Sequence, residues 1–187
     1  MISRIWHNTT YRFLILFLGI FTLLYYFQLA FIGIVAPGNI YIPFLAEHVN
    51  YIEWLRYGLM QTSASIIRAM GEQVFTTEIW FRVVGRGGFV MAYDCLGYGV
   101  MSFFTAFVIA FPKPIKSKLW FLPAGLLLIQ TLNVIRFVFL GLYWRQSELK
   151  TIIDHHDLFN IVLYIVLMIV LYFWLNSGKV AKVQAVS

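Results

Sequence analysis

The sequence predicts an all-α membrane protein with about four transmembrane helices, an outer amphipathic helix and a short β-hairpin. Hydrophobic residues make up 61% of the 187 residues and charged residues only 12%, with a mean hydropathy of +0.80. One small soluble core cannot bury that much apolar surface. Four apolar runs are also long enough to cross a hydrocarbon core. We therefore expect residues 1–187 to form a single integral membrane domain.

The four predicted spans cover about residues 11–35, 96–111, 119–143 and 158–175. A helix rises 1.5 Å per residue, so about 20 residues cross the hydrocarbon core. The second and fourth runs are short, and we expect them to cross with little tilt or through a thinned bilayer. The first run is expected to be a retained helix, because Pro37 falls where a signal peptide would be cleaved.

Lysines decide the predicted orientation, because Lys and Arg are held back on the cytoplasmic side of a membrane. Lys113, Lys116 and Lys118 form a tight cluster between the second and third spans. With this loop inside, both termini are cytoplasmic and all eight acidic residues lie outside.

The outer segment 36–94 is too polar to span the membrane, and its first half predicts an amphipathic helix on the outer leaflet. Apolar residues recur there at steps of three and four, whereas Glu53, Arg56 and Arg68 exclude a membrane span. The recurring positions are Leu45, Val49, Ile52, Leu55, Leu59, Ser63, Ile66 and Met70.

The second half of the outer segment predicts a β-hairpin. Residues 79–84 and 89–93 have the composition of strands, and the glycine-rich run 85–88 between them is typical of a tight turn. The glycines permit the positive φ that such turns need.

Cys95 is the only cysteine, and it stands at the outer end of the second span. Backbone N–H groups and the positive end of the helix dipole favour a thiolate there, whereas Asp94 opposes it unless Asp94 is the N-cap. A single cysteine excludes an intramolecular disulfide. Cys95 is therefore a candidate nucleophile, and the alternative is a small apolar filler.

Arg136 lies inside the third span, seven residues before Tyr143 and hence about 10 Å below the outer end. A charge at that depth costs roughly 2.5–3.5 kcal/mol on insertion scales, so it is expected to face the bundle and a polar partner. Asn133 lies on the same helix face and could position it. The alternatives are snorkelling to outer headgroups and a structural ion pair.

His155 and His156, flanked by Asp154 and Asp157, open the fourth span on the predicted outer side. Most loop histidines are solvated surface residues, so each is a weak signal alone. The group could bind a divalent metal, but no third ligand cluster appears elsewhere in the sequence. We predict neither a metal nor a cofactor.

Together these positions resemble the exosortase/archaeosortase family of membrane transpeptidases. The resemblance rests on a hairpin leading into Cys95-Leu96-Gly97, an Asn-x-x-Arg pair at Asn133 and Arg136, and an outer histidine, His156, opening the last span. It covers about residues 71–175 and leaves the N-terminal third as a generic anchor. Two positions depart from the family pattern, which commonly has Ser at residue 96 and Gly at residue 160.

The resemblance implies a cysteine peptidase or transpeptidase in the inner membrane of a prokaryote, with its active site on the outer face. Catalytic roles fall on Cys95, Arg136 and His156, with Asn133, Asp157 and His155 in support. The implied partners are exported proteins with a C-terminal sorting signal and a transmembrane span, alongside membrane lipids. No nucleic acid partner is expected.

Two alternatives stay open. One keeps the same three catalytic residues but ends in hydrolysis, which makes a membrane endopeptidase. The other is a non-catalytic membrane subunit, in which Arg136 pairs structurally with a residue such as Asp94 and Cys95 is filler.

Overall fold

The computed structural model describes residues 8–36, 40–143 and 155–177, with the backbone alone for residues 155–158. Four of its helical segments are long and apolar enough to cross a membrane. These are α2 (Thr9–Val35), the segment Tyr93–Ala110 that ends in α5 (Tyr98–Ala110), α6 (Ile115–Tyr143) and α7 (His155–Asn176). The predicted all-α membrane class and its four spans are confirmed. The largest boundary difference is at the start of α6, at residue 115 against the predicted 119.

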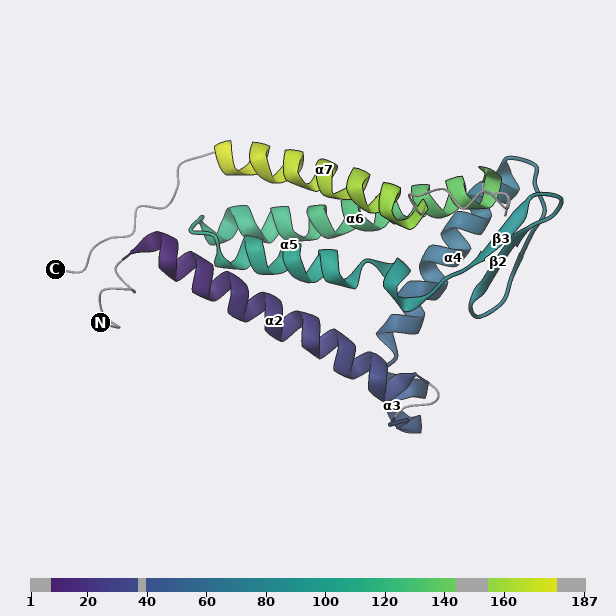
Figure 1. The fold of residues 1–187 in the computed structure, drawn as a ribbon, viewed down its shortest axis with the longest axis horizontal. Coiled ribbons are helices and arrows are strands. Elements are labelled where there is room, and N and C mark those ends of the chain that lie inside the picture. Colours follow the sequence, from purple (N-terminus) through teal and green to yellow (C-terminus); the bar gives the residue numbers. More distant parts are fainter. Residues whose placement is uncertain (1–7, 37–39, 144–154, 178–187) are drawn as a thin grey trace.

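The spanning helices run side by side, with α5 between α2 and α6 (Figure 1). The start of α2, the α5–α6 connection and the end of α7 lie at one end of this bundle. The two helices that follow α2 in the chain, and the sheet, lie at the other end. The lysine-rich connection and the segment leading into Cys95 are therefore at opposite ends of the molecule, as the predicted topology requires.

The predicted amphipathic helix is broken in two, into α3 (Pro43–His48) and α4 (Tyr51–Ala69). Asn50 causes the break, because its side-chain oxygen accepts a hydrogen bond from the backbone N–H of Glu53 at 3.2 Å and caps α4. The prediction of one continuous helix from Leu45 was wrong at this point.

The predicted apolar face of α4 is only partly buried within the protein. Ile52, Leu59 and Ser63 are buried as expected, but Ile66 and Met70 are 40% and 59% exposed. The reason is that α4 packs against α6, so its contact face is set by that helix and not by a leaflet alone. The position of α4 on the outer leaflet stays a prediction.

The sheet contains the predicted hairpin, formed by β2 (Trp80–Val83) and β3 (Gly87–Val90), together with an unpredicted strand, β1 (Val74–Thr76). The strands are antiparallel in the order β1-β2-β3. Gly87 and Gly88 lie in β3 and not in the turn. Gly88 is needed in the strand, because a Cβ there would lie 2.7 Å from the carbonyl oxygen of Phe81.

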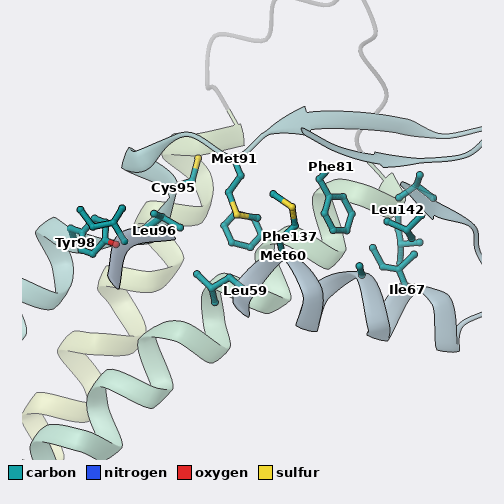
Figure 2. Packing of buried hydrophobic residues seen from close by; sticks show 14 of the residues in the cluster. Leu59, Met60, Ile67, Phe81, Met91, Cys95, Leu96, Tyr98, Phe137 and Leu142 are labelled. Carbon is teal, nitrogen blue, oxygen red and sulfur yellow. The ribbon is translucent and has the colours of Figure 1, made fainter. Parts of the chain in front are cut away.

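The sheet is fastened to the C-terminal end of α6. Arg86, in the β2–β3 turn, donates to the carbonyl oxygen of Leu142 at 3.1 Å and pairs with Glu72 at 2.6 Å. Gly141 allows the close approach, since a Cβ there would lie 3.0 Å from Ile67 and 3.2 Å from Phe81. Figure 2 shows the resulting apolar core, in which residues of α4, the sheet and α6 meet.

Single cysteines in a Cys95→Ala background test the orientation. Ile115→Cys lies at the start of α6, between Lys113 and Lys116, and Glu78→Cys lies in the β1–β2 turn. Both native side chains are exposed. We expect a membrane-impermeant thiol reagent on intact cells to label Glu78→Cys and to leave Ile115→Cys unlabelled until the cells are lysed. Labelling of both, or the reverse pattern, would overturn the predicted topology.

Candidate active site

Cys95 lies in a separate turn before α5. The 3₁₀ turn η1 covers Tyr93–Leu96, and the Cys95 N–H donates to the carbonyl oxygen of Ala92 at 3.0 Å. The prediction that Cys95 opens the second helix directly is thus corrected, because α5 begins only at Tyr98. Asp94 caps neither element, since the N-caps are Ala92 and Gly97.

Gly97 joins this turn to α5 and sets its distance from α6. Its φ of +76° lies in the left-handed region that favours glycine, and a Cβ there would lie 3.0 Å from the Asn133 amide nitrogen. The structure therefore gives a physical reason for glycine two residues after the cysteine. A side chain at residue 97 would strain the turn and push Asn133 away.

Two side-chain amides on α6 hold the Cys95 turn in place through hydrogen bonds. The Asn133 nitrogen donates to the Leu96 carbonyl oxygen at 3.4 Å and to the Gln130 side-chain oxygen at 3.1 Å. The Gln130 nitrogen donates to the same Leu96 carbonyl at 3.4 Å. Asn133 thus holds the cysteine turn as well as lying near Arg136. The sequence analysis missed Gln130, although a glutamine one turn before Asn133 in an apolar span was a signal for it.

The Cys95 side chain is buried, with 4% of its surface exposed, among apolar residues of α4, α5 and α6. In Figure 2 it lies at the edge of this cluster, with its sulfur directed away from Leu59 and Met60. The guanidinium of Arg136 is close enough to interact electrostatically with the thiol. Burial favours the apolar-filler alternative, whereas a nearby arginine charge favours a nucleophilic thiol.

Arg136 is 5% exposed and lines a pocket of about 200 Å³ between the spanning helices. Asn133 from α6, and Asp94 and Gly97 from either side of Cys95, line the same pocket. The structure therefore brings together the cysteine turn, the asparagine and the arginine.

The first turns of α7 complete the walls around Arg136. Asn160 and Tyr164 line the 200 Å³ pocket, and Phe159 lines a smaller one of about 60 Å³ that also touches Arg136. The side chains of His155, His156 and Asp157 lie outside the described residues. The backbone of α7 begins at His155, which places Asp157 inside the first turn and not at the N-cap.

A second polar group, which the sequence analysis did not anticipate, borders the pocket. The Tyr51 hydroxyl donates to the side-chain oxygen of Gln28 on α2 at 2.6 Å. Arg56 pairs with Glu53, and its guanidinium lies over the Tyr93 ring at 5.2 Å from the centroid. Arg56, which excluded a membrane span in the sequence, is only 5% exposed. Gln28 lines the pocket, so α2 contributes to the site and is more than an anchor.

Within the parts of the chain that the structure describes, no three His, Cys, Asp or Glu side chains gather as a metal site. The chemistry available at the pocket comes from a guanidinium, a carboxylate on Asp94, amides and hydroxyls, with the Cys95 thiol directly behind the wall that Asp94 and Gly97 form.

Comparison with known proteins agrees with the predicted resemblance. The family model described as transmembrane exosortase matches residues 7–174. This match includes α2, whereas the resemblance in the sequence was placed at about residues 71–175. Searches of the curated proteins and of the solved structures found no match. Since the family model covers most of the chain, this protein belongs to the transmembrane exosortase family.

Proposed function

We propose that this protein is a membrane cysteine transpeptidase that cleaves the C-terminal sorting signals of exported proteins and transfers the cleaved chains to an acceptor. The observation that carries the proposal is that Asn133, Arg136 and the residues on either side of Cys95 line one pocket inside a bundle of membrane-spanning helices. Ionisable residues inside a membrane bundle are costly and mark functional sites. Membership of the exosortase family supports the same reading.

In the first step, the Cys95 thiolate attacks the carbonyl carbon of the scissile peptide bond. The thiolate forms when the Cys95 thiol gives its proton to His156, which becomes an imidazolium. The carbonyl oxygen gains negative charge, and Arg136 donates to it with a planar, permanently charged group in a water-poor site. The C–N bond then breaks, the leaving amine takes that proton from the His156 imidazolium, and a thioester remains on Cys95.

In the second step, a nucleophilic acceptor attacks the thioester carbonyl and loses a proton to the imidazole, and Cys95 leaves as a thiolate. Attack by water in place of the acceptor gives hydrolysis, the endopeptidase alternative. Because Cys95 is buried and only its neighbours line the pocket, we expect the η1 turn to shift slightly when the substrate enters.

His156 is the proposed acid and base, and the register of α7 supports it. Residue 156 lies four residues before Asn160, so the two positions share one face of the helix, and Asn160 lines the pocket beside Arg136. Residue 155 shares its face with Phe159 instead, which touches the smaller pocket.

The proposed setting is the inner membrane of a prokaryote, with both termini in the cytoplasm and the pocket on the outer face. The four spans and the lysine-rich connection opposite the cysteine turn support this orientation. The proposed substrate carries a short recognition motif, a hydrophobic span and a basic cytoplasmic tail, so its scissile bond also arrives at the outer face.

The test is to co-produce the protein with a candidate exported protein that carries such a C-terminal signal. We expect wild type to remove the C-terminal span and Cys95→Ala to leave it uncleaved, because no other thiol is present. Mass spectrometry of the new C-terminus separates transfer to an acceptor from hydrolysis. Cleavage by Cys95→Ala would refute the cysteine mechanism. Slow alkylation of the wild-type thiol at pH 7, together with no cleavage, would favour a non-catalytic subunit.

A further inference from the structure

Gln28 is a polar side chain in the apolar helix α2, where its oxygen joins this helix to α4 through a hydrogen bond from Tyr51. It lies seven residues before Val35, the last residue of α2, and hence about 10 Å inside the span. Arg136 is equally far from the end of α6, so the pocket has a polar group at similar depth on two of its walls. Lipid chains offer no hydrogen-bond partner at such a depth, so a glutamine there needs a protein or a ligand partner.

Tyr51 fixes how the Gln28 amide is turned. Its hydroxyl donates to the Gln28 oxygen at 2.6 Å, so the amide NH₂ group is left to point elsewhere. The Gln28 amide nitrogen has no hydrogen-bond partner among the described residues, and Gln28 lines the 200 Å³ pocket. The structure thus holds two N–H donors in a set orientation at the pocket wall.

Tyr98, the first residue of α5, lines the same pocket and supplies a second polar group. It is 8% exposed, and its hydroxyl makes no hydrogen bond within the described part of the chain. The charged and phenolic groups that act on it electrostatically, on Tyr51, Glu53, Arg56 and Tyr93, come from α4 and η1. A buried hydroxyl without a partner costs stability, and the Tyr98 hydroxyl would gain a partner if its side chain turned into the pocket as a ligand entered.

We propose that Gln28 and Tyr98 form a binding subsite for the main chain of the substrate polypeptide next to the scissile bond. The Gln28 NH₂ group donates to one peptide carbonyl oxygen, and the Tyr98 hydroxyl bonds a second main-chain group as the substrate enters. An extended peptide presents unpaired C=O and N–H groups at every residue, whereas a lipid chain presents none. This proposal rests on the proposed transpeptidase function and adds where its substrate is held.

The test uses the full-length protein, co-produced with the same candidate sorting-signal protein at limiting amounts. Gln28→Met keeps the length of the side chain and removes the donors, and we expect cleavage to slow about five- to tenfold, the loss of one hydrogen bond to substrate. Higher substrate production should recover most of the rate, because binding is weakened and the chemical step is not. Tyr51→Phe should slow cleavage less, since it frees the amide without removing it.

Tyr98→Phe separates binding from structure. We expect cleavage about three- to tenfold slower, with a melting temperature equal to or above that of wild type, because an unsatisfied buried hydroxyl is removed. Matched controls on the lipid-exposed side of α2 are Thr22→Val and Tyr26→Phe, which should cleave as wild type does.

Alkylation of Cys95 by iodoacetamide, measured without substrate, distinguishes the possible failures. Unchanged alkylation with slow cleavage in Gln28→Met and Tyr98→Phe supports the subsite. Wild-type cleavage in both variants, or alkylation that falls in parallel with cleavage, would overturn it. Cleavage that persists in Cys95→Ala would instead refute the proposed function, whatever the Gln28 variants do.

Discussion

Arg136→Lys is expected to lose at least about a hundredfold in cleavage rate while the protein still accumulates in the membrane. Loss of one donor to a developing oxyanion typically costs that much in rate. Lysine keeps the positive charge but not the planar two-pronged donor, and its shorter reach moves the charge from its place in the pocket. Arg136 is buried and lines both pockets, so its geometry has little freedom to adjust. Initial rates of substrate cleavage, normalised to membrane content, give the measurement.

Arg86→Lys is the matched control for this experiment. Arg86 also uses its guanidinium at two partners, Leu142 and Glu72, but it lies in the sheet turn and away from the pocket. Cleavage within about twofold of wild type is expected there, since surface ion pairs contribute little. Near-normal cleavage by Arg136→Lys would remove the oxyanion role and favour a simple charge pair.

Most of the fold was predictable, because a membrane imposes length and hydropathy on each span. The break between α3 and α4 was missed, although Asn50 and Glu53 have the spacing of a helix N-terminus signal. Strand β1 was missed because its three residues are too few to show an alternating pattern. The buried face of α4 depends on its contact with α6, and helix periodicity alone does not specify such a partner.

The residues of the candidate site that are unusual in an apolar chain were predictable, and its neutral polar residues were missed. A lone cysteine, an intramembrane arginine and its neighbouring asparagine are conspicuous in an apolar chain, and a consistent topology placed them together. Gln28, Gln130 and Tyr98 are neutral residues without a motif. Their roles depend on which helices meet, and α2 reaches the site by packing on α5 and by the hydrogen bond between Gln28 and Tyr51 of α4. A glutamine inside the predicted first span was the one available signal.

His156→Ala is expected to abolish cleavage, whereas His155→Ala should retain a measurable fraction. General acid–base catalysis contributes about 10²- to 10⁴-fold, so loss of the proton carrier has an effect at least as large as that of Arg136→Lys. The positions are adjacent in α7, and neighbours on a helix point about 100° apart, so only one can share the face of Asn160 at the pocket. Residue 156 lies on the helix face of Asn160, and residue 155 lies on the helix face of Phe159.

Alkylation of Cys95 gives an independent measure of the same assignment. An imidazolium beside Cys95 stabilises the thiolate form. The wild-type thiol should therefore react with iodoacetamide near pH 7, at a lower pH than an ordinary cysteine needs. His156→Ala removes the cation and should move the onset of reaction to higher pH, while His155→Ala should leave it in place. Loss of cleavage in His155→Ala beside normal cleavage in His156→Ala would reverse the assignment. Normal cleavage in both variants would exclude histidine from the mechanism and require another proton carrier at the pocket.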